Sequence, residues 1–390
     1  MKKQNLLLSK QYNKLKMKTN FLKFFALVAL TLTIGCSSDE SSGPSVPNLE
    51  GSVLQGNITT DLNVPAGNYN LKGVVVVKSG ATLTIEPGTT FTVSTADQAL
   101  GANYLQGEQG GKIVANGTSS SPIVFTAQSA QVGAWGGIIM NGKARINVAG
   151  GTEIAEAGGL VYGGTDDADN SGSLKYVRVE YAGAAITGGT AEYNAFSFFG
   201  LGTGTVLENL QAYKGADDAF EFFGGAVSAT NLAAFGCEDD NIDWDRGYRG
   251  TLNNIWIIQP SNGDFGFECS NLPVEFNSSP RSNPTVSNVT ITGSGNVNKS
   301  AFNFKEGTAG IITNVKATNV GFGVDLRNQL TQFQDASLKI NNANITFITA
   351  LTKNGISGDT TNINSIVGVN ASAVGANTAP FTTGTWVKNL

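Results

Sequence analysis

The motif Asn209-Leu210-Gln211-Ala212 returns 22 residues later as Asn231-Leu232-Ala233-Ala234, and 23 residues after that as Asn254-Ile255-Trp256-Ile257. The same Asn-apolar-x-apolar pattern appears again at Asn288, Asn314 and Asn344, with spacings of 34, 26 and 30 residues. A period of about 22 to 26 residues suits one coil of a parallel β-helix, with longer gaps where a loop is inserted at a corner. We therefore expect a ladder of stacked side-chain amides, about 4.8 Å apart, in which each asparagine bonds the next.

A second pattern begins ten to fourteen residues after these asparagines and places one polar residue between two apolar ones. This alternation is typical of a strand with one face in the core. It occurs at Phe196-Ser197-Phe198, Phe220-Glu221-Phe222, Ile242-Asp243-Trp244, Phe267-Glu268-Cys269, Phe302-Asn303-Phe304 and Val324-Asp325-Leu326. Two patterns that keep phase over several coils predict an all-β fold, a right-handed parallel β-helix, because parallel crossovers are right-handed. A propeller or a sandwich does not explain such columns.

The composition excludes several classes of function. The 390 residues include no histidine, so Ser-His-Asp and Cys-His catalysis and His-ligated zinc are excluded. The formal net charge is −5, but the first 35 residues hold seven lysines and no acid, which leaves 18 basic and 30 acidic side chains, or −12, in the remainder. Such acidity disfavours nucleic acid and favours cations as partners. Cys237 and Cys269 are too few for a disulfide scaffold, and we expect buried free thiols.

The N-terminus resembles a lipoprotein export signal. An apolar run over residues 24–34 follows Lys18 and Lys23, and its eleven residues are too short to cross a membrane as a helix. The run leads directly into Gly35-Cys36, which resembles a lipobox, and an ordinary secretory signal with an incidental cysteine is the alternative. We expect a signal peptide over residues 1–35, with Met17 as its start, then a lipidated tether over 36–52 and a β-helix over 53–390. The lipid on Cys36 would hold the protein on the outer membrane, exposed at the cell surface.

Acidic residues recur at equivalent positions in three successive coils. In a parallel stack such residues lie about 5 Å apart, where like charges repel by roughly 1 kcal/mol or more. A bound Ca²⁺, which takes six to eight oxygen ligands, is the favoured compensation. Salt bridges to Lys214, Arg246 and Arg249, or simple solvation, are the alternatives. The predicted calcium ligands are Asp217, Glu221, Asp239, Asp240, Asp243, Asp264 and Glu268.

Two resemblances add to these observations. Asp239-Asp240-x-x-Asp243, with Asp217 one coil earlier, is similar to the calcium-binding corner of the family 9 pectate lyases. That resemblance implies a Ca²⁺-dependent lyase in which a lysine removes a proton from a uronate. Most of the chain also resembles a group of Bacteroidetes β-helix lipoproteins, which implies fold and location without an activity. The segments that carry this likeness are Leu174-Lys175-Tyr176-Val177-Arg178, Asp217-Asp218-Ala219-Phe220-Glu221-Phe222-Phe223-Gly224-Gly225, Asp239-Asp240-Asn241-Ile242-Asp243-Trp244 and Gly247-Tyr248-Arg249-Gly250.

Two functions remain open from the sequence. The favoured one is a non-catalytic, surface-anchored β-helix that binds a polysaccharide or a surface protein through Trp244, Tyr248 and Phe223 beside the acids. The alternative is a calcium-dependent polyuronate lyase. It needs a basic residue at the acidic groove, and the candidates are Lys305, Arg327, Lys214 and Arg249.

Overall fold

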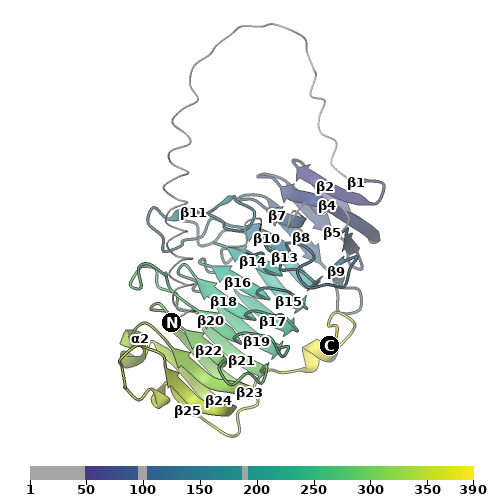
Figure 1. The fold of residues 1–390 in the computed structure, drawn as a ribbon. Coiled ribbons are helices and arrows are strands. Elements are labelled where there is room, and N and C mark those ends of the chain that lie inside the picture. Colours follow the sequence, from purple (N-terminus) through teal and green to yellow (C-terminus); the bar gives the residue numbers. More distant parts are fainter. Residues whose placement is uncertain (1–48, 95–102, 187–191) are drawn as a thin grey trace. The chain divides into compact units, whose positions relative to one another are not determined.

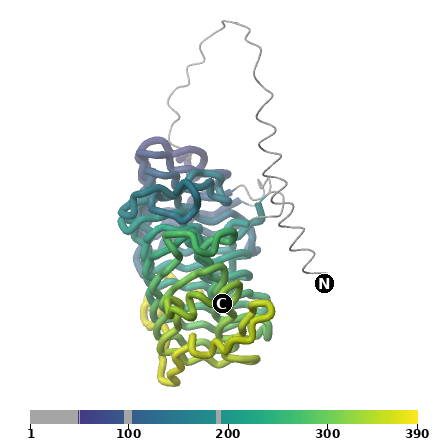
Figure 2. The backbone as a smooth tube through the Cα atoms, turned by 90° about the vertical axis from the view of Figure 1, so that its left-hand side faces the viewer, coloured from purple at the N-terminus to yellow at the C-terminus, as the bar shows by residue number. Residues whose placement is uncertain are grey.

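The computed structural model describes residues 49–94, 103–186 and 192–390, which form a right-handed parallel β-helix (Figure 1). The coils stack on one another in register (Figure 2). Among the named strands in these ranges, the pairs are parallel apart from β1–β2 and β11–β12. The fold prediction is therefore confirmed. The predicted signal peptide, Cys36 and the tether up to residue 48 lie outside the described residues. No helix among the described residues is both long enough and apolar enough to cross a membrane.

Each coil contributes to three sheets, which we call A, B and C. Sheet A contains the ends of β2 (Val53–Ile58) and β4 (Asn68–Val77), and then β7 (Tyr104–Gly107), β10 (Ile138–Asn141), β14 (Phe196–Phe199), β16 (Phe220–Phe223), β18 (Ile242–Asp245), β20 (Phe267–Cys269) and β22 (Ser300–Phe304). Sheet B contains β3 (Leu62–Val64), β5 (Thr82–Ile85) and β8 (Lys112–Asn116), and sheet C contains the start of β4, β6 (Thr90–Val93) and β9 (Ile123–Ala127).

Longer strands pass from sheet B into sheet C. These are β13 (Gly172–Glu180), β15 (Val206–Tyr213), β17 (Ala229–Phe235), β19 (Thr251–Ile258) and β21 (Thr285–Thr292). The strands β23 (Gly310–Leu326) and β24 (Leu338–Asn354) continue through all three sheets. The remaining elements are β1 (Leu49–Glu50), the hairpin β11 (Thr152–Ile154) and β12 (Val161–Gly163), α2 (Thr331–Gln334), the 3₁₀ turn η1 (Asn364–Ile366), β25 (Val367–Val369) and α3 (Ala379–Thr382).

The bend between sheets B and C is made by the predicted asparagine ladder. Asn209, Asn231 and Asn254 have left-handed φ angles of 58°, 59° and 62°. Asparagine adopts this conformation more readily than other residues with a side chain, so it can turn the strand where each coil bends. The Asn231 amide donates to Asn209 Oδ1 at 2.8 Å, and the Asn254 amide donates to Asn231 Oδ1 at 2.6 Å. The ladder prediction is confirmed for these rungs.

The later rungs differ from the predicted ladder in two places. Asn314 bonds Asn288 at 2.7 Å as expected, but the Asn288 amide donates to Asn253 Oδ1. The next rung is Asn342, with φ 55°, and not Asn344, which donates to a backbone carbonyl instead. The Asn342 amide donates to Asn314 Oδ1 at 3.4 Å, so the rung lies two residues before the predicted Asn344.

The core consists of apolar residues that point inward from the three sheets. On sheet A the two residues that flank each polar position are buried, and they stack on their counterparts in the next coil. The rings of Phe196 and Phe220, for example, lie 5.0 Å apart and nearly parallel. Cys237 and Cys269 are free and buried, as expected. The inward columns therefore fix the position of the polar residues between them, which point outward.

Replacement of a ladder asparagine tests both of its roles. We expect Asn231→Ala to lower the free energy of unfolding by about 2 to 4 kcal/mol, because alanine loses two amide hydrogen bonds and is strained at a left-handed φ. Asn231→Gly loses the same bonds without the strain and should cost about 1 kcal/mol less. Urea titration followed by circular dichroism measures both. Equal costs for the two variants would show that the backbone conformation contributes nothing.

Candidate metal centre

A column of polar side chains runs along the outer face of sheet A. Register pairs its members directly, coil by coil, and three acids follow one another: Glu221 opposite Asp243, and Asp243 opposite Glu268. The full column is Ser197, Glu221, Asp243, Glu268, Asn303, Asp325 and Lys353. Parallel pairing therefore places three carboxylates on neighbouring strands with no other residue between them.

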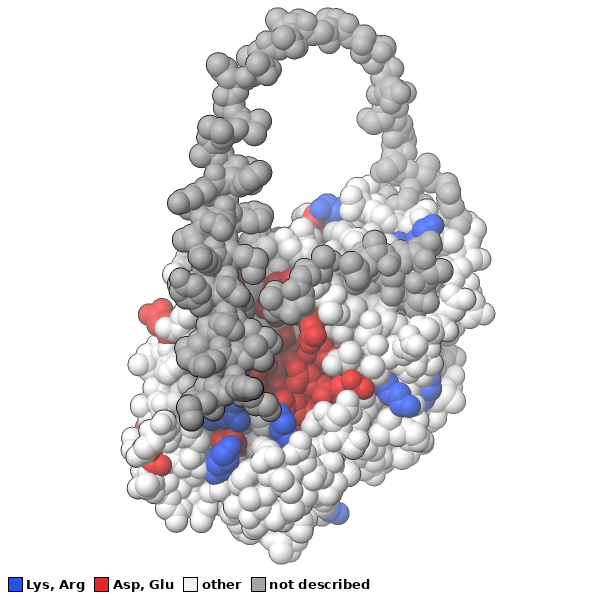
Figure 3. Space-filling model, in the orientation of Figure 1, with Lys and Arg blue, Asp and Glu red and all other residues white. Residues whose placement is uncertain are grey.

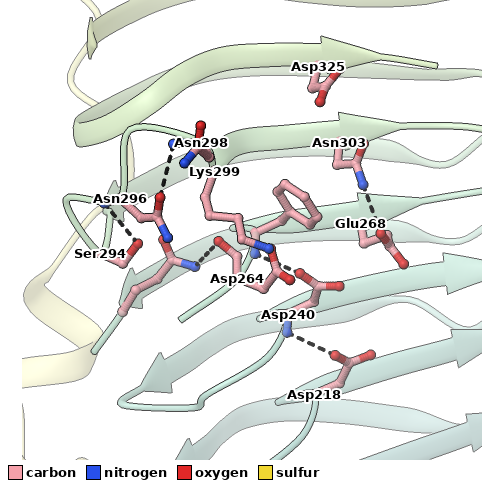
Figure 4. Close-up of polar contacts among 12 residues, drawn as sticks. Asp218, Asp240, Asp264, Glu268, Ser294, Asn296, Asn298, Lys299, Asn303 and Asp325 are labelled. Carbon is pink, nitrogen blue, oxygen red and sulfur yellow. Dashed lines mark hydrogen bonds and ion pairs between the residues drawn. The ribbon is translucent and has the colours of Figure 1, made fainter. Parts of the chain in front are cut away.

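A second set of acids lies in the turns that lead into these strands. The Asp218 carboxylate accepts the backbone N–H of Asp240 at 3.0 Å, and the Asp240 carboxylate accepts the N–H of Phe265 at 2.7 Å (Figure 4). Each aspartate thus satisfies a backbone donor of the following coil, and both side chains are almost fully buried. These bonds hold the turn carboxylates beside the column of sheet A.

The turns and the column together form three groups of acids that could hold a metal ion. In each group, one oxygen from each member lies within 4.8 Å of the others. We call Asp218, Glu221 and Asp243 the first triad, and Asp240, Asp243 and Glu268 the second triad; Glu192, Asp217 and Asp239 form a third group at the edge. Asp243 belongs to both triads, and its Oδ1 is buried without a hydrogen-bond partner. Hard oxygen ligands of this kind suit Ca²⁺.

Burial and mutual repulsion disfavour the ionised form of these acids. The pKa values of four acids are raised well above the ordinary range. Burial is the largest cause, and repulsion from neighbouring carboxylates is the second. The four are Asp218, Glu221, Asp240 and Asp243. The same causes raise the pKa of Asp217 to about 8, and a hydrogen bond that the protonated Asp217 donates to Asp239 contributes. In the absence of a cation, Asp217 therefore holds its proton near neutral pH.

Only part of this charge is compensated by the protein. Within the part of the chain that the structure describes, the ion pairs of the predicted metal ligands are Lys299 with Asp264 and Lys305 with Glu268. Glu268 also accepts a bond from the Asn303 amide at 2.8 Å, which Figure 4 shows beside the Lys299 contact. The Asn194 amide similarly donates to Glu221 at 2.6 Å. Asp264 is thus tied to Lys299 and belongs to none of the three groups.

The acids gather in a recess on one face of the β-helix, with basic residues at its edge (Figure 3). The neighbouring Asp245 on β18 is paired with Arg246, which also bonds Glu153 of the hairpin strand β11 at 2.8 Å. Burial, opposed by Arg246, raises the pKa of Asp245 to about 7. The inserted hairpin therefore contributes to one side of the acidic site.

The structure separates the predicted basic residues from one another. Lys305 lies in the site, but Arg327 pairs with Asp325 further along the column. Arg249 pairs with Asp167, and Lys214 lies over the ring of Tyr213, outside the acidic groups. The hypothesis that Lys214, Arg246 and Arg249 neutralise the repeated acids is therefore wrong, because these side chains have other partners or positions.

The predicted aromatic binding face is wrong. Trp244, Tyr248 and Phe223 are buried, with exposed fractions of 0%, 0% and 2%, so they cannot contact a ligand. The Trp244 indole donates to Thr308, and the Tyr248 hydroxyl donates to the carbonyl of Val227. Their polar atoms are satisfied inside the protein, and their role is to fill the core.

Four residues at the site were missed as site residues from the sequence. Asp218 follows the same spacing as Asp240 one coil later, so comparing the coils position by position would have found it. Lys299, Asn194 and Glu192 lie in connections that do not repeat, and no periodic signal marks them. The acids themselves were predicted because they keep the period of the coils.

The family comparison agrees with this architecture. Residues 56–390 match the model of the pectate-lyase like beta helix domain, and the chain belongs to that family. Searches of curated proteins and of solved structures found no significant match. The family shows the fold of residues 56–390, and the chemistry of the site rests on the residues described above.

The raised pKa values predict how pH affects the metal-free protein. An acid whose pKa is higher in the folded than in the unfolded state binds an extra proton on folding, so its stability contribution is present at low pH and is lost as pH rises. For Asp217 the window runs from its ordinary pKa near 4 to about 8. With a chelator present, we expect the Tm to be at least about 3 °C lower at pH 8 than at pH 5.

Scanning calorimetry of wild type and Asp217→Asn measures this effect. The variant has no carboxyl group to ionise at this position, so its Tm should depend less on pH. An equal or higher Tm at pH 8 for the metal-free wild type would mean that the acids are already compensated within the protein.

Proposed function

We propose that this chain is a calcium-binding β-helix, held at the cell surface by a lipid on Cys36, that binds a polysaccharide or a surface protein without cleaving it. The observation that carries the calcium proposal is the position of Asp243 in both triads, with a buried Oδ1 that has no hydrogen-bond partner. A buried, partnerless carboxylate oxygen is costly unless a cation or a proton meets it.

Calcium fits this donor set better than the smaller Mg²⁺. The first triad offers three carboxylates on a turn and two neighbouring strands, which can supply up to six oxygens in an irregular arrangement. Ca²⁺ accepts six to eight oxygens with flexible geometry, whereas Mg²⁺ requires a near-ideal octahedron and retains several waters. The ion would also remove the repulsion between Glu221 and Asp243, which lie opposite each other on β16 and β18.

The state of Lys305 argues against the lyase alternative. A Brønsted base must be neutral to accept a proton. Burial alone would lower the pKa of Lys305, but the carboxylates of Glu268 and Asp243 outweigh it and raise that pKa above its ordinary value. The ammonium is therefore stabilised in its charged form. Because Arg327 and Arg249 are also held in ion pairs, each predicted base except Lys214 is engaged with an acid.

Calcium binding is tested by titration calorimetry on residues 48–390. We expect wild type to bind Ca²⁺ with a micromolar Kd and Asp243→Asn to bind at least about tenfold more weakly, since it loses charge at the shared ligand. Glu208→Gln is the matched control, because Glu208 pairs with Lys175 on sheet B, away from the acids. If the control loses as much affinity as Asp243→Asn, the effect is one of net charge and not of the site.

The same samples distinguish binding from cleavage. With polyuronate and Ca²⁺ added, the binding proposal expects no ultraviolet absorbance from an unsaturated product. Growth of that absorbance in wild type, and its loss in Lys305→Ala, would replace the proposal with the lyase alternative.

The lipid anchor rests on the sequence around Cys36. We expect wild type in its native host to sediment with membranes and Cys36→Ala to be released from them, because the thiol that carries the acyl chains is gone. Membrane fractionation followed by detergent extraction measures this. A Cys36→Ala protein that stays with the membranes would point to a different means of attachment.

A further inference from the structure

The two triads are the same arrangement repeated one coil apart. Register relates Glu221 to Asp243 and Asp243 to Glu268, while the turn bonds relate Asp218 to Asp240. Each member of the first triad thus has its counterpart in the second triad on the following coil. What differs between the two must come from the side chains around them.

The second triad is already paired with a cation of the chain. Lys305 directly follows β22, and its ammonium is bonded to Glu268 and interacts electrostatically with Asp243. Two of the three acids of this triad are therefore in the field of a positive charge supplied by the chain. No ion pair to Asp218, Glu221 or Asp243 is found in the described residues.

The reason for the difference is one position of the repeat. The backbone N–H of Lys305 bonds the carbonyl of Cys269, and the N–H of Ser270 bonds the carbonyl of Trp244, its counterpart one coil earlier. Ser270 therefore occupies, relative to the first triad, the position that Lys305 occupies relative to the second. Ser270 is neutral and 3% exposed, so it brings no charge to the first triad.

We propose that the Lys305 ammonium is a built-in cation that fills the second triad and limits the acidic site to one bound metal ion, in the first triad. The inference rests on the proposed calcium function for the first triad only. For the second triad it rests on the position of Lys305. Removal of this ammonium leaves Asp240, Asp243 and Glu268 as an arrangement equivalent to the first triad, with no cation between them.

The test counts Ca²⁺ ions in wild type and Lys305→Met by native mass spectrometry and calorimetry. We expect one bound ion in wild type and two in Lys305→Met. The second ion should bind Lys305→Met at least about tenfold more tightly than any additional Ca²⁺ binds wild type. Lys175→Met is the control, since it also removes one positive charge but on sheet B, where Lys175 pairs with Glu208 away from the acids, and it should leave the count at one.

Each result decides a separate claim. One ion in both proteins would overturn the inference and leave the calcium function standing. No ion in wild type and one in Lys305→Met would support Lys305 as the cation of the second triad, and would refute calcium binding at the first triad. If Lys305→Met is unfolded without metal, Ca²⁺ should restore its fold, since the ion replaces the ammonium. Lys305→Gln is the second variant. If Lys305→Met and Lys305→Gln both stay unfolded at millimolar Ca²⁺, the result counts against the inference.

Discussion

The parallel stacking of coils in register is the constraint on which the rest of this structure depends. It places the same position of every coil in one column, about 4.8 Å from its neighbours. For asparagine the repetition is favourable, because each amide is both donor and acceptor and satisfies the rungs on either side. For a carboxylate it is unfavourable, because an ionised acid only accepts hydrogen bonds and repels its copies. The same geometry thus stabilises one corner of the coil and strains another.

The acidic corner is stabilised by several different partners. Backbone N–H groups satisfy Asp218 and Asp240, amides reach Glu221 and Glu268, and ammonium groups meet Asp264 and Glu268. Among the described residues, these contacts leave Asp243, at the centre of the site, without an ion pair and with no hydrogen-bond partner for its Oδ1. A proton or a metal ion can provide the missing charge, and the two compete for the same oxygens. Under the proposed function, calcium affinity would therefore depend on pH through these carboxylates.

The sequence predicts the structural features that repeat from coil to coil, and it does not predict those that occur in a single coil. The period of the coils was enough to identify the fold, the amide ladder and the column of acids. The exposed position of Trp244 was a mistake that strand geometry could have prevented, because a neighbour of the outward Asp243 must point inward. Phe223 does point outward with Asp245, but the inserted segment covers it, with the Tyr162 ring 6.5 Å away. Such coverage, like the Lys299 ion pair, comes from connections without a period, so a single sequence gives no signal for it.

The sign of the charge along sheet A changes over a few coils. The column that contains Glu221 and Asp243 ends in Asp325 and Lys353, which pair with each other across one register step at 2.9 Å. The adjacent outward positions change in the same direction, from Asp245 through Ser270 to Lys305. Because equivalent strand positions of successive coils stay in register, single substitutions are enough to move the boundary between acid and base. Where basic residues enter the column thus decides which of its acids are paired within the protein, and the coils before Lys305 hold Glu221 and Asp243, for which the described residues provide no ion pair.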